Sequence, residues 1–174
     1  IFHSEESLSS RAFKNYPSIE YERYIEPFLG GGAVFKYLKP ENKSILADIN
    51  DELIGFYNCL KHRPNELYLS MKKHMKEHCE DYYYEIRAKN NLTDEAKKAS
   101  RFLYLNHTCY NGIYRVNSQN EFNVPIGDSK EFNVSEEEFM EYSNLLSKAE
   151  IINEDVRISL NKAKKNDLIF VDPP

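Results

Sequence analysis

The sequence predicts an α/β fold in which short strands and helices alternate around an open sheet. Three segments support this prediction. Residues 24–35 are typical of a strand, a turn with three glycines and a helix, whereas residues 44–47 and 168–171 are apolar runs that we interpret as strands, the last one buried. Each strand ends at an acidic residue or a glycine turn. Open α/β sheets bind their ligands at the carboxyl ends of their strands, so we expect these residues to meet at one ligand-binding edge.

The first two segments indicate which ligand this edge binds. Three glycines let the backbone bend sharply and approach a ligand, and the following helix offers free N–H groups. The turn lacks the Lys-Ser/Thr of a P-loop and the full G-x-G-x-x-G of dinucleotide enzymes, which disfavours pyrophosphate. An acidic residue roughly twenty positions later can accept hydrogen bonds from ribose hydroxyls. The pattern therefore predicts a nucleoside-containing cofactor at Glu26, Gly30, Gly31, Gly32 and Asp48. Taken singly, each feature also fits an ordinary turn, with Asp48 merely beginning a helix cap.

The central part of the chain is predicted to be helical. Helices are expected over residues 51–60 after Asn50, over 64–78 with a proline in the first turn, over 94–106 after Thr93, and over 135–146 with Ser135 and Glu138 as a capping box. Two short segments at 114–116 and 122–124 flank a polar stretch at 117–121, which predicts a hairpin with a longer loop. We expect residues 61–147 to form a subdomain inserted between residues 1–60 and 148–174.

Composition limits the class of protein. A chain of 174 residues with 41% hydrophobic residues can bury one substantial core. No apolar run approaches the ~20 residues of a membrane helix, and three cysteines without paired spacing favour reduced thiols. We therefore expect a cytoplasmic protein that does not contact a membrane. His74 and His78 have the spacing of two metal ligands beside Cys79, but no further ligand cluster accompanies them, so no metal site is predicted.

Residues 101–120 reverse the charge of the chain locally. They contain Arg101 and Arg115 but no acidic residue, within a protein whose formal net charge is -5. Such a patch can approach phosphates although the whole protein repels them. The segment also carries side chains that stack on bases or read them: Tyr104, Tyr110, Asn111, Tyr114 and Arg115. From composition alone, a surface hairpin with a solvated arginine is the simpler interpretation.

These motifs together resemble the Dam-type DNA adenine-N6 methyltransferases. The resemblance rests on E-P-F-L-G-G-G at residues 26–32, A-D-I-N at 47–50, a long central stretch at 102–127, and D-P-P at 172–174. The central stretch is the most specific of them, because no general fold requirement dictates Y-N-G-I-Y-R or E-F-N-V-P-I-G. The resemblance implies a Rossmann-like methyltransferase core with an inserted helical and hairpin DNA-recognition subdomain. It also implies S-adenosylmethionine as the cofactor and double-stranded DNA as a partner.

For the cofactor, the resemblance places Glu26 and the three glycines around the methionine end of S-adenosylmethionine, and Asp48 on the ribose. Ile49 would pack against the adenine ring, with Phe28 and Val156 completing the site. Asp155 follows the apolar pair at 151–152 and would accept a hydrogen bond from the adenine amino group. Asp155 can equally be an ordinary turn or helix cap.

For catalysis, the resemblance assigns the D-P-P motif of Asp172, Pro173 and Pro174 to the target adenine. The exocyclic amine is a poor nucleophile because its lone pair is delocalised into the ring. The Asp172 side chain and the Pro173 carbonyl would accept its hydrogen bonds, and the methyl group would then pass directly to it without a metal. The family motif continues with an aromatic residue, and a Gly-Gly-Lys element of the family has no match in residues 1–22. We therefore expect this chain to be a segment of a longer protein, inactive alone.

For DNA, the resemblance has Arg115 read a guanine edge, while Ile113 and Pro125 contact base methyl groups. Tyr110 and Asn111 would fill the gap left by the flipped adenine. The predicted function is site-specific adenine-N6 methylation of duplex DNA, with GATC as a target and a cognate restriction endonuclease as a further partner. Two alternatives remain open: an enzyme of the same fold that methylates another amine, such as a glutamine side chain, and a catalytically inactive DNA-binding module.

Overall fold

The computed structural model describes residues 20–128 and 135–173. The chain divides into two compact units, and each is described by itself. Of the described residues, the sheet unit comprises 20–54 and 140–173, and the helical unit comprises 55–128 and 135–139. The two boundaries expected from the sequence lie after residues 60 and 147.

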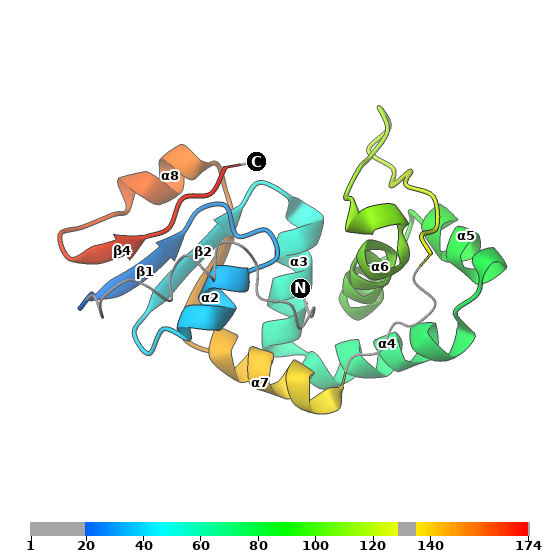
Figure 1. The fold of residues 1–174 in the computed structure, drawn as a ribbon, viewed down its shortest axis with the longest axis horizontal. Helices are drawn as coiled ribbons and strands as arrows, with labels where there is room; N and C mark the ends of the chain where they lie inside the picture. The colour runs from blue at the N-terminus through cyan, green and yellow to red at the C-terminus, as the bar shows by residue number, and fades with distance from the viewer. Residues whose placement is uncertain (1–19, 129–134, 174) are drawn as a thin grey trace. The chain divides into compact units, whose positions relative to one another are not determined.

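The sheet unit is an α/β layer of parallel strands (Figure 1). The strands order as β3-β2-β1-β4. They are β1 (Arg23–Glu26), β2 (Ser44–Asp48), β3 (Ala149–Asn153) and β4 (Asp167–Ile169). Helix α2 (Ala33–Leu38) joins β1 to β2, and α8 (Val156–Asn161) joins β3 to β4. The predicted Rossmann-like α/β fold is thus confirmed.

The order of the strands reverses at β1. The chain passes from β1 outward to β2 and β3 and then returns to the other side of β1 to form β4. Ile25 pairs with Ile169, and the Phe170 N–H donates to the Ile25 carbonyl at 2.9 Å. In open α/β sheets, the crevice beyond such a reversal is the ligand-binding position. The carboxyl ends of β1 and β4 therefore mark where a site is expected.

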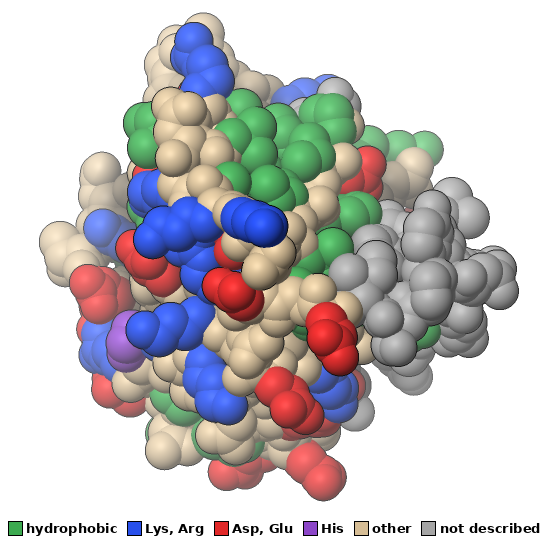
Figure 2. Space-filling view, turned by 90° about the vertical axis from the view of Figure 1, so that its left-hand side faces the viewer, with side chains coloured by type: hydrophobic (Ala, Val, Ile, Leu, Met, Phe, Trp, Pro, Cys, Tyr) green, Lys and Arg blue, Asp and Glu red, His purple; other side chains and the backbone are tan. Residues whose placement is uncertain are grey.

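The run at 168–171 is a strand in part only, and its burial was predicted wrongly. β4 ends at Ile169, and the side chains of Ile169 and Val171 are 37% and 48% exposed. The physical reason is that β4 pairs with β1 alone among the described residues, so one of its edges has no neighbouring strand. Figure 2 views the molecule from this side and shows hydrophobic side chains gathered on the surface. Ile158 and Leu160 of α8 are exposed as well.

The helical unit is built on α4 (Pro64–Glu77), α5 (Glu80–Ala88) and α6 (Glu95–Thr108), followed by the 3-10 turn η1 (Tyr110–Gly112). Helices α3 (Asp51–His62) and α7 (Glu136–Leu146) each cross a boundary between the units. Aromatic rings fill the core of the helical unit. The ring centroids of Phe56 and Phe102 are 6.0 Å apart, and the His74 ring is stacked on the Tyr104 ring with centroids 4.7 Å apart.

The four predicted helices are present, with one change of cap. Asn50 caps α3, and Ser135 and Glu138 form the capping box of α7. Helix α6 is capped by Asp94, whose Oδ1 accepts from the Lys97 N–H at 2.8 Å, and not by Thr93. Helix α5 was not predicted. Its consecutive tyrosines are weak helix formers, and Cys79 at its N-cap makes no side-chain cap hydrogen bond.

The predicted hairpin exists, although its arms are not regular strands. Val116 and Phe122 form an isolated antiparallel bridge, and the Asn123 N–H donates to the Arg115 carbonyl at 3.2 Å. A second bridge joins Cys109 to Ile126 at the base. We call residues 113–126 the recognition hairpin. Its first arm continues directly from η1.

In the described ranges, no helix has the length and apolar character needed to cross a membrane. Residues 20–128 and 135–173 also contain no group of three or more His, Cys, Asp or Glu side chains that could hold a metal ion. His74 instead contacts Tyr82 and Ser100, and His78 contacts Tyr104.

Candidate functional site

A buried carboxylate ends β1. Glu26 is 2% exposed, and its Oε2 accepts a hydrogen bond from the Tyr24 hydroxyl at 2.8 Å. The pKa of Glu26 is raised to about 8: burial is the main cause, the negative charge of Asp172 adds to it, and hydrogen bonds from Tyr24 and the Phe35 N–H oppose it. A cation bound beside such a carboxyl group favours its ionised form, so Glu26 is a candidate for binding a positively charged ligand.

The predicted catalytic aspartate follows β4 on the same sheet edge. Asp172 and Pro173 are exposed, and the negative charge of Asp172 contributes to the raised pKa of Glu26. Pro174 lies outside the described residues. The strands carrying the two carboxylates are adjacent and meet at the reversal of strand order. Asp172 therefore offers acceptor oxygens at the crevice that the fold predicts.

The glycine turn is fastened to the end of β2. Gly30 and Gly32 have φ of 46° and 64°, which side chains rarely tolerate. The Gly30 N–H donates to Asp48 Oδ2 at 3.0 Å, and the Asn50 N–H donates to Oδ1 at 3.0 Å. A Cβ added at Gly30 or Gly31 would meet nothing within 4 Å, so this side of the loop is open. Each Asp48 oxygen keeps a further lone pair for an outside donor.

The remaining predicted cofactor residues are Ile49, Asp155, Phe28 and Val156. Ile49 is 76% exposed, which leaves an apolar side chain available beside the Asp48 carboxylate. Asp155 is the N-cap of α8: its Oδ1 accepts from the Arg157 N–H at 2.9 Å, and Arg157 holds the pKa of Asp155 below its usual value. This matches the alternative interpretation of Asp155, and its contact with an adenine stays a prediction. Phe28 and Val156 are half-buried.

The arrangement fits S-adenosylmethionine by its chemistry. A cationic end suits the buried carboxylate of Glu26, hydroxyl groups suit the oriented oxygens of Asp48, and an aromatic ring suits the exposed side chain of Ile49. The open glycine side gives the backbone room to approach such a ligand. Glu26, the glycine turn and Asp48 lie at the carboxyl ends of adjacent parallel strands, and their contacts with a cofactor stay a prediction.

The predicted DNA-contacting residues belong to the helical unit and are all exposed. Tyr110 and Asn111 lie in η1, where Asn111 has a left-handed backbone with φ of 53°. Tyr110 and Ile113 are 51% and 47% exposed. The Arg115 Nε donates to Asn123 Oδ1 at 2.8 Å, and the Pro125 carbonyl accepts from the Tyr110 N–H at 2.9 Å. The structure therefore places all five on η1 and the recognition hairpin.

Arg101 does not belong to the exposed basic patch, contrary to the prediction. Its side chain is buried, at 6% exposure, and donates to the carbonyls of Ile86 and Arg87 at the end of α5. The sequence interpretation failed because α5, which covers Arg101, was not predicted. Arg115 is the arginine of residues 101–120 that remains exposed.

Comparison with known protein families identifies the family of this chain. The family model described as D12 class N6 adenine-specific DNA methyltransferase matches residues 6–174. The chain belongs to this family. A type II methyltransferase of Lactococcus lactis subsp. cremoris is 34% identical over 164 residues, which is 89% of this chain and 57% of that protein.

Two further relatives of this D12 family member have comparable similarity. A type II methyltransferase of Methanocaldococcus jannaschii is 34% identical over 171 residues, covering 88% of the chain and 58% of the relative. The DNA adenine methylase of Escherichia coli (strain K12) is 35% identical over 158 residues, covering 88% and 56%. The chain therefore spans little more than half the length of these curated relatives.

Sequence reasoning missed two supporting residues of the D12 family member. Tyr24 fixes the Glu26 carboxylate, and Asn123 holds the Arg115 guanidinium. The spacing of two residues along a strand would have placed Tyr24 and Glu26 on one face. No comparable local signal identifies Asn123, because its contact depends on how the two hairpin arms pair.

Proposed function

We propose that the protein transfers a methyl group from S-adenosylmethionine to N6 of adenine in duplex DNA. One observation carries the proposal. Glu26 ends β1 and Asp172 lies shortly after β4, and these two adjacent strands stand at the reversal of strand order. Membership of the D12 family supports adenine in DNA as the acceptor.

The residues of the sheet edge would bind and orient the cofactor. Glu26 would accept the cationic methionine end, Asp48 the ribose hydroxyls, and Ile49 the adenine ring. Asp155, Phe28 and Val156 would bound the adenine pocket. When bound, the cofactor supplies an electrophilic methyl group. Because Asp48 is already fixed by two backbone N–H groups, it needs little reorganisation on binding.

The D-P-P motif would activate the acceptor. The Asp172 carboxylate and the Pro173 carbonyl would accept both protons of the N6 amine in hydrogen bonds, which localises the nitrogen lone pair for attack. Orientation and electrostatics would supply the catalysis. η1 and the recognition hairpin would read the duplex, with Arg115 on guanine and with Tyr110 and Asn111 in the gap of the flipped base. GATC is the proposed target, and a cognate endonuclease stays a prediction.

The test uses the full-length protein with labelled S-adenosylmethionine and duplexes containing GATC or the same bases scrambled. Label on adenine N6 that depends on GATC is the expected result. Label on adenine in both duplexes would support adenine methylation but would contradict GATC as the specific target. Cofactor binding with label on a protein glutamine would favour a methyltransferase that acts on another amine. Binding of DNA without any methyl transfer would favour the inactive DNA-binding module.

Arg115 is expected to control sequence preference. We predict that Arg115→Ala weakens binding of the GATC duplex by about 10- to 100-fold, while binding of a scrambled duplex changes much less. Fluorescence anisotropy at one fixed salt concentration measures both affinities. Lys98→Ala, an exposed cation on α6, is the control. Equal losses on the two duplexes would show that Arg115 contacts only phosphates.

Glu26 is expected to release a proton when the cofactor binds. Its pKa of about 8 means that the free site is largely protonated at pH 7, and a neighbouring cation favours the ionised form. Isothermal titration calorimetry in buffers of different ionisation enthalpy should show release of up to about one proton at pH 7. In Glu26→Gln the release should vanish and the affinity should fall. A wild-type binding heat independent of the buffer would contradict the assignment.

A further inference from the structure

One backbone carbonyl joins the recognition hairpin to α5. The Val124 oxygen accepts from the Tyr83 hydroxyl at 2.9 Å and from the Arg87 Nη1 at 3.0 Å. Val124 is 3% exposed and Tyr83 is fully buried. Burial raises the pKa of Tyr83, so its hydroxyl stays protonated and remains a donor. A carbonyl has two lone pairs, and here α5 occupies both of them.

A third residue of this region reaches the hairpin loop. The Asn90 Nδ2 donates to Glu121 Oε1 at 2.9 Å, and Glu121 in turn accepts from the Asn117 side chain. Tyr83, Arg87 and Asn90 therefore contact one stretch of the second arm, residues 121–124. A stretch held at both ends has little freedom to shift its register against the first arm.

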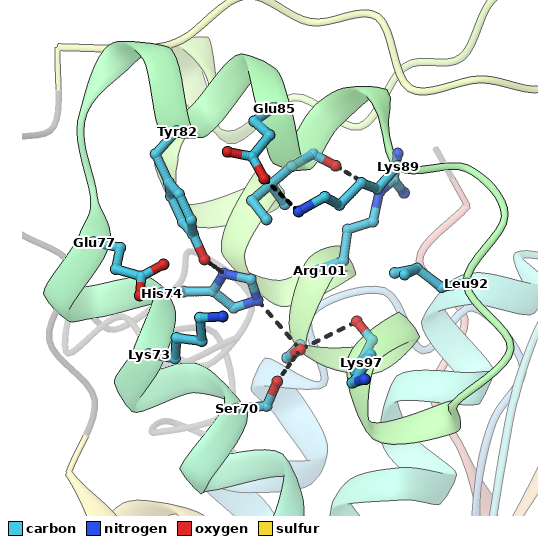
Figure 3. A pocket seen from close by; sticks show the side chains of 12 residues that line it. Ser70, Lys73, His74, Glu77, Tyr82, Glu85, Lys89, Leu92, Lys97 and Arg101 are labelled. Atoms are coloured by element: carbon cyan, nitrogen blue, oxygen red, sulfur yellow. Dashed lines mark hydrogen bonds and ion pairs between the residues drawn. The ribbon is translucent and has the colours of Figure 1, made fainter.

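Arg101 fixes the end of α5 that carries these donors. Its Nε donates to the Ile86 carbonyl at 3.1 Å, and its Nη2 donates to the Arg87 carbonyl at 2.8 Å and to Asn90 Oδ1 at 2.9 Å. The last carbonyls of a helix have no partner within the helix, so Arg101 acts as a side-chain cap for α5. Figure 3 shows Arg101 extending across the wall of a pocket toward the end of α5.

The first arm depends on this attachment. Asn123 precedes Val124, and it binds Arg115 twice, through its N–H to the Arg115 carbonyl and through its Oδ1 to the Arg115 Nε. At the base of the hairpin, the Tyr110 N–H donates to the Pro125 carbonyl, and a Cβ on Gly127 would lie 2.7 Å from the Cys109 carbonyl oxygen. The two arms are therefore joined by hydrogen bonds and close packing, so we expect a displacement of Val124 to displace Arg115 and Tyr110 as well.

We propose that α5, capped by Arg101, positions the recognition hairpin on DNA through the hydrogen bonds of Tyr83 and Arg87 to the Val124 carbonyl. This inference rests on the proposed function for its DNA reading. Tyr83, Arg87 and Arg101 are positioning residues, since they act through Asn123 and Arg115. Their loss should disturb the reading of DNA and leave the cofactor site of the sheet unit unchanged.

The chain offers a matched pair of variants on one helix. Tyr83→Phe removes the hydroxyl that donates to Val124 at 2.9 Å, and Tyr82→Phe removes a hydroxyl that contacts His74 Nδ1 at the same 2.9 Å. Tyr82 points into the pocket of Figure 3, so its contact serves α4 and not the hairpin. Both changes remove a hydroxyl from adjacent tyrosines of α5. Tyr82→Phe is therefore the control for the loss of a tyrosine hydroxyl from this helix.

Two readouts separate positioning from stability in the full-length protein. Amide hydrogen exchange at Asn123, measured without DNA, should become about three- to tenfold faster in Tyr83→Phe and should hardly change in Tyr82→Phe. The preference for a GATC duplex over a scrambled one should fall about threefold in Tyr83→Phe alone. Cofactor affinity should be the same in both variants and the wild type.

The outcomes distinguish this inference from the proposed function. Equal exchange at Asn123 in the two variants would overturn the positioning role, even in an enzyme that methylates GATC. Faster exchange without a change in duplex preference would show that the hairpin is held by α5 but does not read the sequence, which also rejects the inference. Loss of the proposed function would appear separately, as a wild-type protein that binds the cofactor and methylates no DNA.

Discussion

Replacing Asp172 with alanine should lower the rate of methyl transfer by about 10²- to 10³-fold, the loss expected for one preorganised polar contact at a reacting group. The proposed role of Asp172 is to accept a proton of the target amine in a hydrogen bond. Alanine removes that acceptor and leaves the strand β4 intact, because Asp172 follows the strand and is exposed. Single-turnover kinetics with saturating cofactor and DNA measure the chemical step directly.

The same variant should change the cofactor site in a defined direction. The charge of Asp172 raises the pKa of Glu26, so its removal should lower that pKa from about 8. Proton release on cofactor binding at pH 7 should therefore decrease, while binding itself should persist. Glu150→Ala, an exposed acidic residue on β3, is the control and should keep the full rate. An Asp172→Ala enzyme with the wild-type rate would remove Asp172 from the mechanism.

The edge of the sheet was predictable because parallel strands bring their carboxyl ends together. Glu26, Asp48 and Asp172 each follow a short apolar run, and the order β3-β2-β1-β4 places all three on one edge. Nothing beyond strand identity and parallel pairing was needed for this step. The proximity of Glu26 and Asp172 was not predictable, since it depends on β4 returning beside β1.

Arg101 shows where sequence reasoning fails. Arg101 and Arg115 occupy the same charge-reversed segment, yet one is buried and the other exposed. The difference arises from α5, whose tyrosine-rich sequence gave a weak helix signal. Asp155 is a milder instance, because an aspartate before a short helix fits both a cap and a ligand. Local patterns identify residue types, whereas their roles depend on tertiary partners.

A polar network around His74 leads to the second large effect. Ser100, which is fully buried, donates to the Lys97 carbonyl at 3.1 Å, so its oxygen is an acceptor for His74 Nε2 at 3.3 Å. His74 Nδ1 lies 2.9 Å from the Tyr82 hydroxyl (Figure 3). Burial and the negative charges of Glu77 and Glu85 together raise the pKa of Tyr82 to about 12, so its hydroxyl stays protonated, and Glu77 is a further hydrogen-bond partner of that hydroxyl. Both ring nitrogens of His74 therefore have a hydroxyl partner, which can donate or accept, so the buried imidazole can stay neutral without an unpaired nitrogen.

The charges around the ring act in the same sense as burial. Burial, together with the positive charges of Lys73 and Lys89, lowers the pKa of His74 to about 4. Glu77 and Glu85 line the same pocket, of about 350 Å³, but Glu85 is paired with Lys89 at 2.5 Å. An unfolded histidine takes up a proton near pH 6.5. Between about pH 6.5 and pH 4, the unfolded chain therefore binds a proton that the folded protein does not.

This difference should make the helical unit less stable in mild acid. The stabilisation is complete above pH 6.5 and is lost progressively as the pH falls toward 4, to a total of ~3 kcal/mol in the free energy of unfolding. The chain has no tryptophan, so urea unfolding followed by circular dichroism at a series of pH values is the suitable measurement. His74→Gln should be less stable at pH 7 and should lack this part of the pH dependence. An NMR titration of His74 with a midpoint near 6.5 would contradict this prediction, because the folded and unfolded chains would then bind the proton equally well.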